Sequence, residues 1–143
     1  MENRELVGQF EKNIRIMHAL ADRLDKSGKE RYSQHEMGVL MKLHLNGRAR
    51  LKDIAERFGV SSSALCLTFG KMEKAGLILR EVDSKDKRNT YYSLTRTGTA
   101  TAKRMIEKFR DKLAKIFEPL SKGDEAKMLA ALKTINDVLE KQL

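Results

Sequence analysis

The chain contains 143 residues, of which 34% are charged and 41% hydrophobic, and its formal net charge is +9. This length suits a single domain, residues 1–143, with a sizeable core. A membrane helix needs about 18 or more consecutive apolar residues, and the sequence has no such run. One cysteine, Cys66, excludes an internal disulfide framework and a zinc site built from cysteines. We therefore expect an ordered cytoplasmic protein without a membrane partner, a metal or a cofactor.

The positive charge is concentrated in one segment of the chain. Nine basic and four acidic residues lie between Lys71 and Arg104, which gives this stretch a net charge of +5, whereas the remaining 109 residues carry only +4. Such an excess suits a polyanionic partner, and nucleic acid is the obvious candidate. The alternative is a solvated helical surface that is rich in lysine.

The first two expected helices are identified by their apolar spacing and their terminal residues. One spans roughly Glu2–Asp25. The second begins after Ser33, because Glu36 three residues later completes a capping-box pair, and it ends at Asn46-Gly47. The expected apolar side of this second helix consists of Val39, Leu40, Leu43 and Leu45.

Two short helices joined by a tight turn are expected next. The first spans about Lys52–Phe58 and is closed by Gly59. Ser61 is placed to cap the second, which continues to Gly76. A pair of short helices joined by a turn with a glycine is the pattern of a helix-turn-helix.

After Gly76 the residue pattern changes from helical to β-prone. Leu77–Val82 and Thr90–Leu94 are short stretches of this kind and predict two strands. Residues 83–89 between them are polar and turn-forming, and three of the seven are basic. The sequence therefore predicts a β-hairpin with a charged tip.

The C-terminal part of the chain predicts two more amphipathic helices. Thr95 is the expected cap of the first, which Pro119 ends or bends, and Ser121 with Asp124 starts the second. These helices and the one at the N-terminus carry apolar stripes that need a partner surface. A second copy of the chain is the economical partner, since two-fold homodimers are the commonest oligomers. The alternative is that these arms fold back onto the middle of their own chain.

The order of these elements and several motifs resemble the MarR (multiple antibiotic resistance regulator) family of winged helix-turn-helix repressors. The motifs are Asp53–Ser61 at the entry of the helix-turn-helix, Glu73–Ile78 at its exit, and Asp86-x-Arg88 followed by Leu94-Thr95-x-x-Gly98 in the hairpin. The resemblance implies a mainly α fold with a small β-hairpin wing, of the α+β kind. Residues 33–98 would form the DNA-binding part, and residues 1–30 and 99–143 the helical dimerisation arms.

The resemblance also implies a function. It predicts a homodimeric transcriptional regulator, a repressor rather than an enzyme, that binds double-stranded DNA. A small aromatic or anionic effector molecule would modulate its affinity for the operator.

The expected DNA-binding residues lie on the fourth helix and in the wing. They are Ser61, Ser62, Ser63, Leu67, Lys71, Lys74, Lys85, Asp86, Lys87 and Arg88. The serines stand at a helix N-terminus, which favours phosphate, and the lysines add phosphate contacts that position the protein without reading sequence. Arg88 is expected to enter a narrow, A·T-rich minor groove. The resemblance implies that Asp86 orients this arginine or a neighbouring donor, and the alternative is that Asp83 and Asp86 serve only as turn residues.

The middle of the fourth helix departs from the family pattern. Cys66 and Leu67 stand where many members carry a polar residue or an arginine, and Gly70 replaces a larger side chain. An outward leucine contacts a thymine methyl group but cannot read a guanine. We therefore expect relaxed sequence specificity, or reliance on DNA shape.

Two other classes of function remain as alternatives. A basic RNA-binding protein would need aromatic stacking platforms, but aromatic residues make up only 6% of the chain, with Tyr91-Tyr92 as an adjacent pair. A small helical enzyme would need a nucleophile with a nearby base, a glycine-rich phosphate loop or metal-ligand spacing. None of these patterns is found in the sequence.

Overall fold

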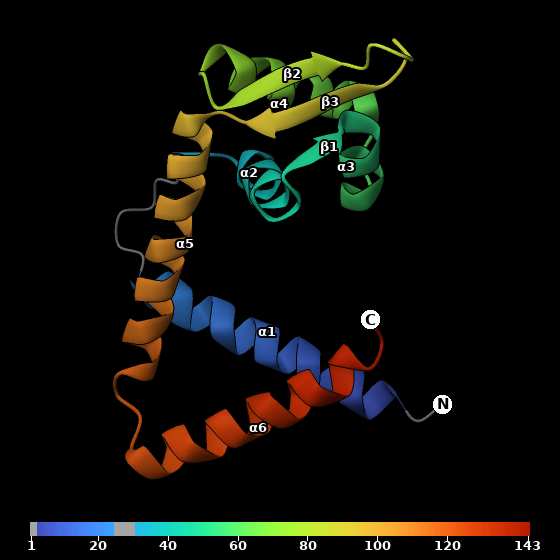
Figure 1. Cartoon of the computed structure of the whole chain (residues 1–143). Coiled ribbons are helices and arrows are strands. Elements are labelled where there is room, and N and C mark those ends of the chain that lie inside the picture. The colour runs from blue at the N-terminus through green and yellow to red at the C-terminus, as the bar shows by residue number, and fades with distance from the viewer. Residues whose placement is uncertain (1–2, 25–30) are drawn as a thin grey trace. The chain divides into compact units, whose positions relative to one another are not determined.

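The computed structural model describes residues 3–24 and 31–143. Its elements in chain order are α1 (Arg4–Leu24), α2 (Gln34–Asn46), β1 (Arg48–Arg50), α3 (Leu51–Phe58), α4 (Ser62–Lys74), β2 (Ile78–Val82), β3 (Thr90–Leu94), α5 (Arg96–Phe117) and α6 (Lys122–Glu140) (Figure 1). These elements confirm the predicted fold class, mainly α with a small β-hairpin. The expected first helix, Glu2–Asp25, extends at both ends beyond the described residues.

The contacts divide the chain into two compact units. The central unit is Lys29–Lys108, and the terminal unit combines Met1–Gly28 with Phe109–Leu143. The expected DNA-binding part, residues 33–98, falls inside the central unit. Helix α5 begins in the central unit and ends in the terminal one.

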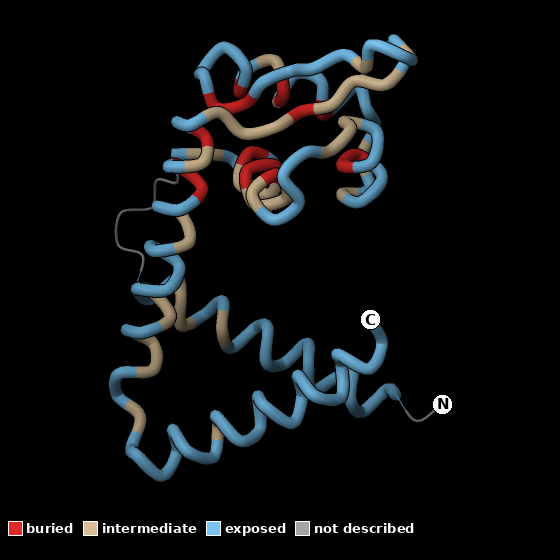
Figure 2. Tube along the Cα trace, in the orientation of Figure 1, coloured by how far each residue is buried: buried red, intermediate tan, exposed pale blue. Residues whose placement is uncertain are grey.

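The hydrophobic core of the central unit lies between its helices and its sheet (Figure 2). Its largest fully buried side chains are Val39, Leu40, Leu43, Ile54, Leu65, Phe69 and Met72. Phe69 of α4 meets Tyr92 of β3 edge to face, with ring centroids 4.5 Å apart, a geometry that aromatic pairs favour. The prediction that Leu45 shares this core is wrong, because its side chain is 74% exposed. Two steps along an α-helix turn a residue by about 200°, so Leu45 points away from the side that Leu43 buries.

Local capping residues determine where the helices begin and end. Ser33, Ser61 and Ser121 each accept a hydrogen bond from the backbone N–H three residues later, at 3.1 Å in every case. Gly47 and Gly59 follow α2 and α3 with φ of +81° and +65°, in the left-handed region that glycine adopts without strain. The predicted caps of α2, α4 and α6 are therefore confirmed.

The predicted hairpin is confirmed, and a third strand joins it. The sheet order is β1-β3-β2, with both pairs antiparallel. In this register Arg50 of β1 and Glu81 of β2 lie on either side of Tyr91 of β3. The sequence did not indicate β1, because three residues are too few for a recognisable alternation of apolar and polar side chains. We call β2, β3 and residues 83–89 between them the wing.

The start of α5 is held against Gly76 and Leu77, the two residues before β2. The hydroxyl of Thr95 accepts a hydrogen bond from the Gly98 N–H at 2.9 Å, which caps the helix as predicted, and it donates one to the Gly76 carbonyl. Gly98 lies so close to Leu77, the residue before β2, that an added Cβ would clash with the Leu77 carbonyl oxygen. Only glycine therefore fits at this position of the helix.

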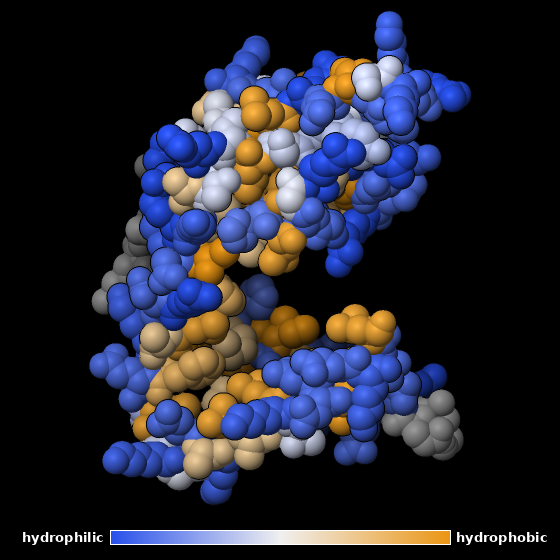
Figure 3. All heavy atoms as spheres, viewed as in Figure 1, coloured by the Kyte–Doolittle hydropathy of each residue, from blue (hydrophilic) through white to orange (hydrophobic). Residues whose placement is uncertain are grey.

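The terminal unit consists of α1, the end of α5, and α6. Helix α5 ends at Phe117, two residues before Pro119, as expected for a residue that cannot continue a helix. No residue of α1 or α6 is buried, and Figure 3 shows hydrophobic side chains on the surface of this unit. The large hydrophobic residues exposed on α1 and α6 are Leu6, Val7, Phe10, Ile14, Ile16, Leu24, Leu129, Leu132, Ile135, Val138 and Leu139.

Candidate nucleic-acid interface

Helix α4 presents its N-terminus and one of its faces to solvent. Ser61 caps the helix by accepting the Ala64 N–H at 3.1 Å, and Ser62 and Ser63 are exposed on its first turn. Leu65 and Phe69 bury the opposite side in the core. Because the first backbone N–H groups of a helix lack intrahelical partners, this end is suited to a phosphate.

The outward centre of α4 is apolar. The side chain of Leu67 is 82% exposed, and Cys66 beside it is exposed as well. An added Cβ at Gly70 would meet nothing within 4 Å, so this glycine leaves an open surface. The face that would enter a major groove therefore offers few hydrogen-bonding groups at its centre.

The two lysines near the end of α4 have different surroundings. Lys71 Nζ lies 3.0 Å from Glu36 Oε1, and the Glu36 side chain is only 8% exposed. Glu36 also donates its backbone N–H to Ser33, so the predicted capping residue has a second contact, through its carboxylate, that the sequence did not indicate. Lys74 is exposed in the last turn of α4.

Two aspartates shape the tip of the wing. Asp83 Oδ1 accepts the Lys85 N–H at 2.9 Å, and Asp86 Oδ1 accepts the Arg88 N–H at 3.1 Å. Such bonds from an aspartate to the backbone two residues later mimic a backbone turn. Both turns leave the side chains of Lys85 and Lys87 exposed.

Asp86 also holds the side chain of Arg88. Its two oxygens accept hydrogen bonds from Arg88 Nε at 3.1 Å and Nη2 at 3.3 Å. These side-chain bonds, followed by the backbone bond from Arg88, lower the pKa of the Asp86 carboxyl below its usual range. The Arg88 side chain is nevertheless 90% exposed. The carboxylate therefore orients a guanidinium that stays accessible at the tip.

A second basic surface, which the sequence analysis missed, lies beside β1. The guanidinium of Arg48 lies over the Tyr91 ring, 3.9 Å from its centroid, in the arrangement of a cation–π contact. Arg50 pairs with Asp53 through Nε at 2.9 Å and Nη2 at 3.2 Å. The Arg-x-Arg spacing was the available signal, since alternate residues of a strand share one face.

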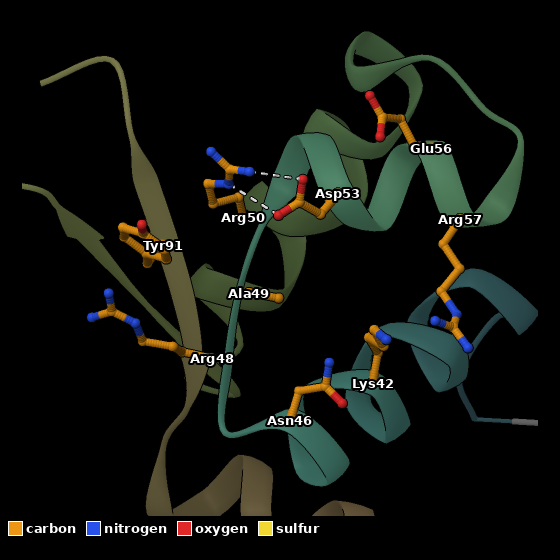
Figure 4. A pocket seen from close by; sticks show the side chains of 9 residues that line it. All are labelled: Lys42, Asn46, Arg48, Ala49, Arg50, Asp53, Glu56, Arg57 and Tyr91. Atoms are coloured by element: carbon orange, nitrogen blue, oxygen red, sulfur yellow. Dashed lines mark hydrogen bonds and ion pairs between the residues drawn. The ribbon is translucent and has the colours of Figure 1, made fainter. Parts of the chain in front are cut away.

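These side chains border an open hollow of about 560 Å³ in the central unit (Figure 4). Its lining residues are Lys42, Asn46, Arg48, Ala49, Arg50, Asp53, Glu56, Arg57 and Tyr91. Four of the nine are basic and two are acidic. The hollow is thus positively charged on balance, although half of that charge is compensated.

Within the described part of the chain, no group of three or more His, Cys, Asp or Glu side chains is placed to hold a metal ion. None of the helices described combines the length and apolar character that a membrane crossing requires.

The central unit therefore combines the N-terminus of α4 with a β-hairpin (Figure 1). The tip of that hairpin carries the exposed Arg88. A helix of this width fits the major groove of duplex DNA, and an arginine fits an A·T-rich minor groove. Helix-turn-helix proteins present the second helix of the motif, here α4, to the base edges.

Comparisons with known proteins agree with this arrangement. The family described as "MarR family" matches residues 33–90. The uncharacterized HTH-type transcriptional regulator YfiV of Bacillus subtilis is 30% identical over 108 residues, which cover 76% of this chain and 68% of that protein.

Solved structures show the same fold. The transcriptional regulator Tm0710 of Thermotoga maritima superimposes with a TM-score of 0.74 at 24% identity, covering 94% of this chain and 96% of that one. BpsR of Bordetella bronchiseptica, whose DNA binding is regulated by 6-hydroxynicotinic acid, superimposes with a TM-score of 0.59 at 14% identity over 96% of both chains.

Proposed function

Because the chain belongs to the MarR family of DNA-binding transcriptional regulators, and not to a family of enzymes, we propose that it is a homodimeric repressor. A small effector molecule modulates its affinity for the operator. The observation that carries this proposal is the pairing of an exposed helix-turn-helix with an exposed wing arginine in one unit.

The proposed DNA contacts follow from the surfaces of the central unit. The N-terminus of α4, with Ser61, Ser62 and Ser63, binds a backbone phosphate beside the major groove. Arg88 enters the adjacent minor groove. Leu67 contacts a base edge, and Asp86 orients Arg88. The lysines that lie near phosphates are Lys71, Lys74, Lys85 and Lys87.

The terminal unit supports dimerisation. Helices α1 and α6 bury no residue within their own chain, yet each has a row of large hydrophobic side chains. Soluble proteins rarely expose apolar patches of this extent without a partner. A second copy related by two-fold symmetry covers the same faces on both chains. Such a dimer places two copies of α4 about one helical turn of DNA apart.

An effector fits this arrangement because the arms connect the two DNA-binding lobes. A ligand that changes the mobility of the arms would alter the spacing of the two α4 helices. DNA binding by BpsR is regulated by 6-hydroxynicotinic acid, a small aromatic acid. For the present chain we propose the same chemical class, a small aromatic anion.

The proposal is tested by selecting duplex fragments from a random pool with the purified protein. We expect two-fold symmetric sites and a dimer by analytical ultracentrifugation. Arg88→Ala removes charge-assisted hydrogen bonds worth about 2 kcal/mol and should weaken binding about ten-fold or more. Lys127→Ala in α6 removes the same charge outside the proposed DNA contacts and is the matched control.

Three results would contradict the proposal. These are preference for single-stranded RNA over duplex DNA in competition, a monomer at micromolar concentration, or wild-type affinity in Arg88→Ala at moderate salt. The effector is sought by the shift in melting temperature with aromatic carboxylates, and a hit must also change operator affinity.

A further inference from the structure

Arg50 occupies the capping position of α3, where its side chain cannot cap the helix. It is the N-cap residue of α3, with φ −84° and ψ 143°, and its side chain makes no capping hydrogen bond. Short polar side chains are favoured at this position because they accept a backbone N–H, which a guanidinium cannot do. The side chain instead extends sideways from the junction of β1 and α3 (Figure 4).

Asp53 fixes the direction of this side chain. Its two carboxylate oxygens accept hydrogen bonds from Arg50 Nε at 2.9 Å and from Nη2 at 3.2 Å. This bidentate arrangement holds the planar guanidinium in one orientation. Asp53 lies in the first turn of α3. The guanidinium is therefore tied to the helix-turn-helix.

The third contact of Arg50 reaches the wing. Its Nη1 donates to Asn89 Oδ1 at 3.4 Å, between residues 39 positions apart in the chain. Asn89 also closes the base of the tip, because its carbonyl accepts the Asp83 N–H at 2.9 Å and its N–H donates to the Asp86 carbonyl at 3.0 Å. Asn89, the residue after Arg88, thus joins the tip of the wing to Arg50.

We propose that Arg50 is a positioning residue that couples the wing to the helix-turn-helix, so that the Arg88 tip and α4 meet DNA in a fixed relation. Asp53 anchors the guanidinium of Arg50. Asn89 accepts the hydrogen bond that this guanidinium donates to the wing. This inference rests on the proposed DNA-binding function and deepens it. The bond to Asn89 is long, so its effect on binding is modest.

The competing role for Arg50 is direct contact with a DNA phosphate. Replacing Arg50 by lysine distinguishes the two roles. Lysine keeps the positive charge but lacks the planar fork that reaches Asp53 and Asn89 together. A phosphate contact also contributes to the salt dependence of binding, whereas a positioning contact does not.

The first measurement needs no DNA. Nitrogen-15 relaxation reports the order of the backbone amides of residues 83–89 in the full-length protein. We expect lower order parameters in Arg50→Ala, Arg50→Lys and Asn89→Ala than in the wild type. Arg48→Ala, two residues away on the same strand, removes an equal charge and the contact with Tyr91 but no contact with Asn89, so it should leave the amides of residues 83–89 unchanged. Unchanged wing amides in Arg50→Ala would overturn the proposal.

The second measurement is affinity for the selected duplex as a function of salt. Arg50→Ala removes the one hydrogen bond of Arg50 that reaches the wing, which predicts a dissociation constant raised about five-fold with the salt slope unchanged. Arg50→Lys should bind as weakly as Arg50→Ala, and Asn89→Ala should add little to Arg50→Ala in the double variant. Wild-type affinity in Arg50→Lys, or a reduced salt slope in Arg50→Ala, would assign Arg50 to a phosphate instead.

Failure of the two proposals can be told apart. If the wild-type protein does not bind duplex DNA, the proposed function fails, while the relaxation data still decide whether Arg50 orders the wing. If the wild type binds and the wing amides do not respond, only the coupling is wrong. The melting temperature of each variant, compared with that of the wild type, shows whether a change in the wing amides reflects a loss of the fold.

Discussion

The ammonium group of Lys71 lies 3.0 Å from the carboxylate of Glu36, which joins the exposed end of α4 to the buried start of α2. The two partners differ in environment, since the Lys71 side chain is 75% exposed and that of Glu36 only 8%. A buried carboxylate without a partner is costly. Lys71 therefore compensates an internal charge, so its proposed phosphate contact contributes less to DNA binding than that of Lys74.

This ion pair leads to a prediction about stability. Lys71→Ala leaves the Glu36 carboxylate buried without its partner, so we expect the free energy of unfolding to fall by about 1–2 kcal/mol in urea titrations. Lys74→Ala on the same helix should change it by less than about 0.5 kcal/mol. The double variant Lys71→Ala/Glu36→Gln removes both charges and should recover most of the loss.

The same variants separate stability from DNA binding. Because the charge of Lys71 is compensated by Glu36, Lys71→Ala should weaken duplex binding less than Lys74→Ala does. Equal losses of affinity would show that Lys71 leaves Glu36 when DNA binds. Equal unfolding free energies for Lys71→Ala and the wild type would show that the pair contributes nothing to the fold.

The Glu36–Lys71 pair also shows what the sequence could and could not predict. Helix boundaries were predictable because they depend on residues within one turn, as with Ser33 and the Glu36 N–H. The contact of Glu36 with Lys71 spans 35 positions, and no periodicity reports it. The link between Arg50 and Asn89 was missed for the same reason. The wing arginine was predictable because its partner, Asp86, is two residues away.

The close approach of Gly98 to the sheet predicts a large effect of a single methyl group. Gly98→Ala would place its Cβ against the backbone carbonyl of Leu77, which cannot move as a side chain can. We expect a loss of about 2–3 kcal/mol of unfolding free energy. Gly70→Ala is the matched control on another helix, where the new Cβ meets no atom within 4 Å.

The expected sign is opposite at the control position. Alanine favours a helix over glycine by about 1 kcal/mol, so Gly70→Ala should raise the melting temperature. Thermal denaturation followed by circular dichroism measures both variants. Two variants of equal stability would contradict the packing of α5 against Leu77.

The Asp86–Arg88 contact predicts how the wing responds to acid. The pKa of Asp86 is lowered in the folded protein by the hydrogen bonds from Arg88. A group of this kind stabilises the fold above its unfolded pKa, and the stabilisation is lost as the pH falls through the folded pKa. The ordinary value is about 3.9, so the contact persists at neutral pH and breaks only in stronger acid.

Titration of the Asp86 carboxyl by carbon-13 NMR measures this effect. We expect a midpoint below the ordinary value in the wild type and a return toward that value in Arg88→Ala. Lys87→Ala removes a neighbouring charge without these hydrogen bonds and should move the midpoint less. An identical midpoint in the wild type and in Arg88→Ala would show that the two side chains do not pair in solution.

The apolar centre of α4 predicts the form of the selected DNA sites. Leu67 is 82% exposed and offers only hydrocarbon to a base edge, so it can contact a thymine methyl group but cannot distinguish a guanine by hydrogen bonding. Sites selected from a random pool should therefore show weak preference opposite the middle of α4. They should also show A·T-rich sequence opposite the wing, where Arg88 meets a narrow minor groove.

A substitution at the same position tests this reasoning directly. Leu67→Arg introduces a fork that pairs with guanine O6 and N7, so the selected sites should gain a G·C pair opposite the helix, favoured by about 1–3 kcal/mol over other pairs. Leu67→Met keeps the apolar character and should leave the selected sequence unchanged. A strict G·C requirement opposite the centre of α4 in the wild type would mean that neighbouring side chains read the bases and that Leu67 does not limit specificity.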